Sequence, residues 1–112
     1  MPVRCDEFNQ VCVITVEGDL TGDNSIAFRT IVDDHIERKH VIDFIVDLEK
    51  CSFIDSEGLE LLLDLKHRCD EMHGQAKLVG VDENCAKILE ITRLEHRFDR
   101  QADLAAALKM MR

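Results

Sequence analysis

The sequence predicts an α/β domain, in which a mostly parallel sheet is packed with helices, and three observations support this fold class. Runs rich in β-branched and apolar residues, such as residues 11–16 and 41–48, alternate along the chain with segments of helical spacing. Strands separated by helices usually pair in parallel. The 112 residues contain no internal repeat and no Pro/Gly/Ser-rich linker. We therefore expect residues 1–112 to form one domain with a mixed sheet of about four to five strands and about four helices.

The N-terminal half begins with a predicted hairpin, in which residues 3–8 pair with residues 11–16 across Asn9-Gln10. A polar cluster at residues 21–25 then supplies N-cap candidates for a helix that extends to about residue 38. The expected apolar face of this helix consists of Ile26, Ala27, Ile31, Val32 and Ile36. Residues 41–48 follow as the central strand.

The C-terminal half continues the alternation. We expect a helix over about 57–73, a strand over 76–81, a helix from Asp82 to about residue 92, a short strand near Phe98 and a helix over about 101–110. The core face expected for helix 57–73 consists of Gly58, Leu61, Leu62, Leu65, Cys69 and Met72. The expected solvent-exposed face consists of Glu57, Glu60, Asp64, His67 and Glu71.

Charge and hydropathy exclude several classes of partner. The chain has 23 acidic and 14 basic residues, a formal net charge of −9, and no cluster of Lys and Arg. Binding to nucleic acid or anionic lipid is therefore not expected, and a protein partner fits better. No apolar segment approaches the roughly 18 residues of a membrane span, and no N-terminal segment combines a basic start with an apolar run of signal length, so we expect no secretory signal. We expect a cytoplasmic protein without direct membrane insertion.

The cysteine pattern indicates neither a disulfide framework nor a zinc ribbon, because the number is odd and no C-x-x-C pair occurs. The five residues are Cys5, Cys12, Cys51, Cys69 and Cys85. We interpret them as small core residues of a reduced protein. His67, Cys69 and His73 do not share one helix face, so we expect no metal ligands there. The motifs of nucleophilic catalysis and nucleotide binding are also absent, so we expect no catalytic residue and no cofactor.

One segment carries a chemically useful side chain at an element boundary. Residues 53–65 read F-I-D-S-E-G-L-E-L-L-L-D-L and place Ser56 between two acids, at the start of a leucine-rich helix that follows the central strand. In α/β proteins this end of the sheet usually carries the functional site. On the local pattern alone, the ordinary interpretation is a helix N-cap supplied by Asp55 or Ser56. Leu59 and Leu63 border the core face and fit either a partner-docking ridge or burial under a neighbouring helix.

These residues resemble the signature of the STAS domain family. Asp55-Ser56-Glu57-Gly58-Leu59, between a V-D-L strand and a leucine-rich helix, is similar to the D-S-x-G-L motif of bacterial anti-sigma factor antagonists. Gly18-Asp19-Leu20-Thr21 resembles the turn that precedes the first helix in that family, and residues 78–81 and 86–90 resemble its later strand and helix. The resemblance covers nearly the whole chain and implies the STAS α/β fold.

The resemblance implies a protein-binding switch rather than a catalyst. Ser56 would be phosphorylated by an anti-sigma factor that is also a serine-protein kinase, and the unphosphorylated chain would sequester that kinase. A metal-dependent serine phosphatase would act on the phosphorylated form, and ATP and metal would belong to these partners. Asp55 would orient the serine, and Gly58 would allow close approach. The implied partner-binding residues are Asp19, Thr21, Asp55, Ser56, Glu57, Gly58, Leu59 and Leu63.

Two positions depart from the family pattern. Glu57 replaces a small residue and adds negative charge beside Ser56, which either weakens phosphorylation or suits a basic kinase cleft. Arg93 stands where relatives often carry glycine, so the helix that begins at Asp82 lacks its usual left-handed cap residue.

Two other functions stay open at this point. A STAS domain can be a non-phosphorylated subunit of a larger assembly, such as a stress-signalling complex or a lipid-transport ATPase. A small acidic enzyme is the second alternative, and it would need a pocket with convergent titratable groups near Ser56.

Overall fold

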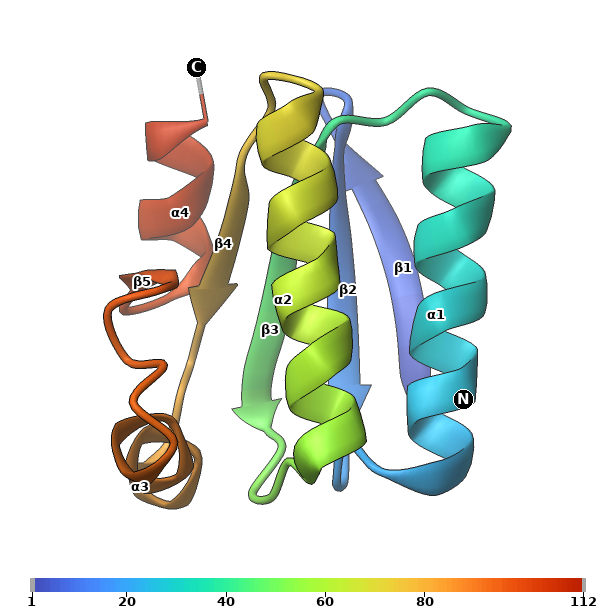
Figure 1. The fold of residues 1–112 in the computed structure, drawn as a ribbon. Helices are drawn as coiled ribbons and strands as arrows, with labels where there is room; N and C mark the ends of the chain where they lie inside the picture. Colours follow the sequence, from blue (N-terminus) through green and yellow to red (C-terminus); the bar gives the residue numbers. More distant parts are fainter. Residues whose placement is uncertain (1, 112) are drawn as a thin grey trace.

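The computed structural model describes residues 2–111, and within them the chain forms a five-stranded sheet and four helices (Figure 1). The spatial order is β1-β2-β3-β4-β5; β1 and β2 are antiparallel, and the later pairs are parallel. The strands are β1 (Val3–Phe8), β2 (Val11–Glu17), β3 (Asp43–Lys50), β4 (Ala76–Val79) and β5 (Asp99–Gln101). The predicted fold class is confirmed. Met1 and Arg112 of the predicted domain lie outside the described residues.

Helices cover both faces of the sheet. They are α1 (Gly22–Glu37), α2 (Ser56–Glu71), α3 (Glu83–Ile91) and α4 (Leu104–Met110). α1 and α2 stand beside each other over one face, where they share the larger core with β2 and β3 (Figure 1). α4 covers the other face and packs through Ala107 on Val11, Val13, Ile45 and Val79. None of the helices among these residues is both long and apolar enough to cross a bilayer.

The opening hairpin and the order of the elements agree with the sequence prediction, but several boundaries are shifted by two or three residues. β3 begins two residues later than expected, because the Val41 N–H donates to the His35 oxygen at the end of α1 (3.0 Å). β4 ends two residues early, since Gly80 turns the chain with a φ of 67°. α4 begins three residues late, because residues 99–101 are used by β5.

The apolar face predicted for α1 is wrong at Ile26, which is 65% exposed. The buried residues of this helix are Ser25, Phe28, Val32 and His35, spaced three or four apart. Two polar side chains therefore occupy positions on the buried stripe, while an apolar one lies outside it. The face predicted for α2 is confirmed, with Met72 only half-buried at its end.

The end of α3 has a left-handed residue after all, and it is Arg93 itself, with a φ of 62°. The Arg93 N–H donates to the Glu90 oxygen (3.0 Å) and the Leu94 N–H to the Leu89 oxygen (2.8 Å). These two bonds are those of a Schellman motif. The prediction that α3 lacks a left-handed cap residue is therefore wrong, because these two hydrogen bonds accompany a non-glycine residue in the left-handed conformation.

The first turn of α2 lies against the loop between β2 and α1. A Cβ atom on Gly58 would come within 2.4 Å of the Leu20 carbonyl oxygen and 2.9 Å of the Ile54 side chain. The Leu20 N–H donates to the Phe53 oxygen (2.9 Å), which ties that loop to the segment before α2. The close approach inferred for Gly58 is thus an approach to its own chain.

A buried cation joins β4 to the edge strand β5. The Lys77 ammonium group is buried and donates to the Asp99 carboxylate, which is 48% exposed. This hydrogen bond, together with the positive charge of Lys77, lowers the pKa of Asp99. Because the folded-state pKa is depressed, the pair stabilises the fold above the ordinary Asp pKa of about 3.9, and that contribution is lost as the pH falls through the lowered value.

We predict that Asp99→Asn reduces stability near neutral pH and flattens the loss of stability below about pH 4. Breaking a fully buried pair costs about 3–5 kcal/mol, but Asp99 is half exposed, so we expect roughly 1–2 kcal/mol. Urea unfolding at several pH values measures both effects. Asp70→Asn is the matched control, because its pair with Lys66 (2.9 Å) is exposed and should contribute less than about 1 kcal/mol. An unchanged acid profile in Asp99→Asn would contradict the role of the pair.

We also predict that Gly58→Ala destabilises the protein by about 1–3 kcal/mol, although alanine is the better helix former, because the added methyl group overlaps the Leu20 carbonyl. Denaturant unfolding measures the change. Glu60→Ala is the control, since Glu60 is an exposed residue of the same helix and should change stability by less than about 0.5 kcal/mol. A Gly58→Ala protein as stable as this control would show that the loop moves away freely.

Candidate functional site

Asp55 caps the start of α2, so Ser56 is not needed for this structural role. Asp55 is the N-cap residue, and its Oδ1 atom accepts the Gly58 N–H at 2.8 Å. Ser56 is the first helical residue and is exposed. The interpretation of Ser56 as the cap is therefore wrong. The Asp55 carboxylate accepts from the Gly58 N–H rather than from the Ser56 hydroxyl, so it fixes the start of the helix that carries Ser56.

The fold brings the predicted turn at Asp19 and Thr21 to the segment before α2. Ser52 Oγ lies 3.5 Å from Asp19 Oδ1, and the Asn24 side-chain amide donates to the Asp19 carbonyl (2.7 Å). Thr21 takes the N-cap position of α1 without making a side-chain cap hydrogen bond. Asp19 is exposed and Thr21 half-buried. The two loops that carry the predicted partner-binding residues are therefore neighbours in space.

The apolar ridge predicted on α2 is only partly exposed. Leu59 is 7% exposed and belongs to the core cluster that also contains Leu20 and Phe28. It cannot present its side chain to a partner, because it is covered by residues of its own domain. Leu63 is half-buried, packs against the same core and retains some exposed surface. Of the two sequence interpretations, burial is correct for Leu59.

Two apolar side chains near Ser56 were not predicted as site residues. Ile26 lines a hollow between α1 and α2 whose other walls include Arg29, Thr30 and Glu57. Phe53, three residues before Ser56, is 47% exposed. Their signal in the sequence was weak, because Ile26 fits a helical core face and an isolated exposed phenylalanine is ordinary.

Negative charge dominates the surface around Ser56. Asp19, Glu57 and Glu60 are exposed there, and Arg29 is the cation that lines the same hollow as Glu57. Like charges at close range raise the cost of adding a further anion unless a partner supplies cations. The surface is therefore electrostatically suited to a basic partner.

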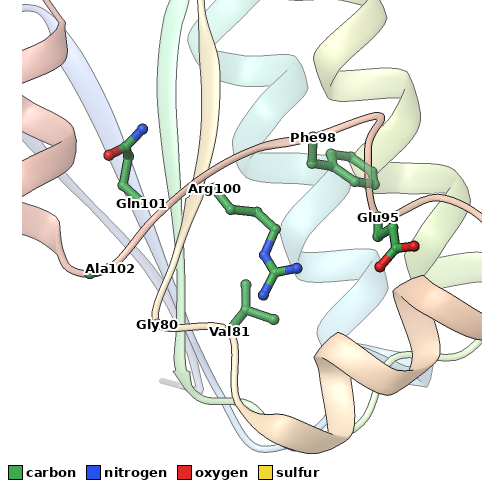
Figure 2. Close-up of a pocket in the computed structure, with 7 residues that line it drawn as sticks. All are labelled: Gly80, Val81, Glu95, Phe98, Arg100, Gln101 and Ala102. Carbon is green, nitrogen blue, oxygen red and sulfur yellow. The ribbon is translucent and has the colours of Figure 1, made fainter.

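A second hollow lies beyond the end of β4, where Arg100 extends toward Val81 and Glu95 (Figure 2). Phe98 and Gly80 complete much of its wall. None of the residues predicted for the site lines it.

The titratable groups that line the hollow beside Ser56 are Arg29 and Glu57, and they belong to two different helices. This combination offers no histidine or cysteine to act on the serine hydroxyl.

Comparisons with known proteins agree with this architecture. TM1081 from Thermotoga maritima, a candidate anti-sigma factor antagonist, has a TM-score of 0.88 at 18% identity over 97% of this chain and 93% of that one. The phosphorylated form of the Bacillus cell fate determinant SpoIIAA has a TM-score of 0.78 at 21% identity, over 98% of this chain and 99% of that one. A sulfate transporter family protein from Wolinella succinogenes has a TM-score of 0.72 at 17% identity, over 92% of this chain and 85% of that one. At these identities the likeness shows the fold alone.

A search among curated protein sequences finds no match to this chain. The model of the STAS domain family, by contrast, matches residues 3–107 and so spans the sheet from its first strand to α4. The family resemblance carried by the segment around Ser56 is confirmed by this match. The chain belongs to the STAS domain family.

Proposed function

We propose that this STAS domain is an anti-sigma factor antagonist. In its unphosphorylated form it sequesters an anti-sigma factor that is also a serine-protein kinase, and phosphorylation of Ser56 by that kinase turns it off. The observation that carries the proposal is the exposure of Ser56 at the first position of α2, where Asp55 already caps the helix. The side chain is thus available for modification without loss of a structural hydrogen bond.

The proposed docking surface surrounds Ser56. Sequence resemblance supports Asp19, Thr21, Asp55, Glu57 and Leu63 as its members. Gly58, which the resemblance also implies, is buried and lets α2 approach the Leu20 loop. We add Ile26 and Phe53, because their exposed apolar side chains lie on the segments that flank α2 and its N-terminal loop. Leu59 acts from beneath, as part of the core that holds the surface in shape. An apolar centre with a charged rim is the ordinary composition of a protein interface.

Phosphorylation at this position is compatible with the fold. A phosphoserine carries a charge of about −1.5 to −2, and a helix N-terminus returns about 0.3–1 kcal/mol to a nearby anion. The acidic neighbours Glu57 and Glu60 offset part of this gain. The isolated domain should therefore tolerate the phosphate without unfolding. We expect its effect in the complex, where burying a dianion without a partner cation costs several kcal/mol of desolvation free energy. Each loss of about 1.4 kcal/mol in binding free energy weakens binding tenfold.

The chemistry of the cycle then belongs to the partners. The kinase supplies ATP and metal, and a metal-dependent serine phosphatase removes the phosphate. The chain itself, acting as one domain over residues 1–112 in the cytoplasm, provides the substrate hydroxyl and the docking surface. Glu57 and the net charge of −9 fit a kinase cleft with a basic rim.

A second candidate is a constitutive, non-phosphorylated subunit of a larger assembly. This chain shares its fold with a sulfate transporter family protein from Wolinella succinogenes, and that likeness supports the alternative. The two candidates differ in whether Ser56 receives phosphate.

We predict that incubation with ATP, Mg²⁺ and the anti-sigma factor kinase of the same genome increases the intact mass of the chain by about 80 Da, the mass of one phosphoryl group. Ser56→Ala should abolish the increase. Ser52→Ala is the matched control, because Ser52 is a second exposed serine four residues away. Phosphate that persists in Ser56→Ala would assign the modification to another residue and reject Ser56 as the acceptor. No phosphate in the wild type would favour the constitutive subunit.

We further predict that Ser56→Asp weakens binding of this kinase at least about tenfold relative to Ser56→Ala, because a buried charge without a partner cation is costly. Isothermal titration calorimetry measures both affinities, and thermal unfolding checks that both variants are folded. Equal affinities of the two folded variants would reject the switch.

A further inference from the structure

Three potential metal ligands meet between the N-terminal hairpin and the last turn of α1. The hairpin register pairs Cys5 with Ile14 and Glu7 with Cys12, so both cysteines project from the face that α1 covers. His35, near the end of α1, lies over them. The ligand atoms of Cys5, Cys12 and His35 all lie within 4.8 Å of one another, with Cys5 Sγ 3.3 Å from His35 Nε2.

The imidazole ring of His35 is oriented as in many metal sites. Its Nδ1 atom lies 2.8 Å from the Ile31 carbonyl oxygen. A carbonyl oxygen can only accept, so Nδ1 carries the proton and Nε2 keeps its lone pair. That lone pair faces the two sulfur atoms in a side chain that is about nine-tenths buried. A backbone carbonyl that fixes the tautomer in this way is the usual outer partner of a metal-bound histidine.

A fourth ligand is available at the solvent side of the cluster. Glu7 Oε1 lies 3.6 Å from His35 Nε2 and 3.5 Å from Lys39 Nζ, and the Glu7 side chain is exposed. A surface hollow lined by Glu7, Gln10, Lys39 and His40 adjoins it. Cys5 is only half-buried, so the cluster is not sealed from solvent.

The geometry points to a site for a thiophilic divalent cation of the Zn²⁺ class, held by Cys5, Cys12 and His35, with Glu7 or a water molecule as the fourth ligand. Two sulfurs, one imidazole nitrogen and one oxygen are a donor set for tetrahedral Zn²⁺. On binding, two S–H bonds break, both protons pass to solvent and two metal–sulfur bonds form, so no redox partner is required.

The structure also pairs Cys5 with Cys12 as a disulfide, which is the competing state of the same two sulfurs. A disulfide uses the thiols but leaves the buried Nε2 lone pair of His35 facing sulfur atoms that have no proton to donate. A cation engages all three groups at once. We therefore assign the cluster to metal binding, and the disulfide becomes a testable alternative.

The site lies at the opposite end of α1 from the candidate docking surface. His35 is in the last turn of α1, whereas Ser25 and Ile26 near its start line the hollow beside Glu57 (Figure 1). The metal would fasten the end of α1 to the edge hairpin, without contact with Ser56. The inference is thus independent of the proposed function.

The test uses the full chain, reduced with a phosphine, freed of metal with a chelator and titrated with Co²⁺ and then Zn²⁺. We expect one Co²⁺ per chain, with a thiolate-to-cobalt charge-transfer band that Zn²⁺ abolishes. Zn²⁺ should also raise the midpoint of thermal unfolding, because it binds only the folded chain tightly. Counting free thiols should give five in the reduced apoprotein and two fewer with Zn²⁺ bound.

Cys5→Ser and His35→Gln each remove one ligand. We expect them to lose more than the roughly 10–100-fold in affinity that removal of an outer partner of a ligand costs. His67→Gln is the matched control, because His67 is an exposed histidine of α2 beside Glu71. If His35→Gln does not fold, the cobalt spectrum of the wild type and the affinity of Cys5→Ser still test whether a metal binds here. Cys5→Ser should fold, because Cys5 is only half-buried.

Three outcomes would overturn the inference. One is cobalt bound without a charge-transfer band, and another is unchanged affinity in Cys5→Ser. The third is a Cys5–Cys12 disulfide that persists in the reductant while no metal binds.

Discussion

The candidate site depends on a close backbone contact between the first turn of α2 and the loop that follows β2. A Cβ atom on Gly58 would overlap the Leu20 carbonyl, so the two segments can pack this closely only with glycine at residue 58. Hydrogen bonds from Leu20 to Phe53 and from Gly58 to Asp55 keep both sides in place. This contact brings Asp19 and Ser56 to one surface, although they are distant in sequence. A side chain at residue 58 would separate the loops that the proposed partner has to read together.

Local hydrogen bonding divides the work between neighbouring residues at the start of α2. Asp55 accepts the free N–H of the first turn, which releases Ser56 from a structural role. The acidic groups around Ser56 favour a basic partner. A phosphate on Ser56 would need cations from that partner to neutralise it, because Arg29 is the cation that lines the hollow beside Glu57. The proposed switch therefore needs no change of fold. The switch would depend only on the negative charge added at Ser56 and on whether cations in the interface neutralise it.

The two ends of α1 carry the residues on which the two proposals rest. At its start, Ile26 is exposed beside α2 and extends the candidate docking surface. At its end, His35 turns toward Cys5 and Cys12 with one ring nitrogen already committed to the Ile31 carbonyl. Both features depend on the same rotation of the helix, which buries Ser25, Phe28 and His35 beside the expected Val32 and leaves Ile26 exposed. A helix with polar residues on its buried stripe often owes them to function rather than to packing.

The sequence by itself determined the order and type of the elements, because hydrophobic periodicity and capping residues are local signals. It also determined the solvent-exposed face of α2 and the place of Ser56 at the start of that helix. Tertiary structure decided the burial of Leu59, the exposure of Ile26 and the meeting of Cys5 and Cys12 with His35. The ligands lie 7 and 23 residues apart, so no local spacing rule connects them. Only the packing of α1 on the hairpin, which depends on the whole core, brings these side chains together.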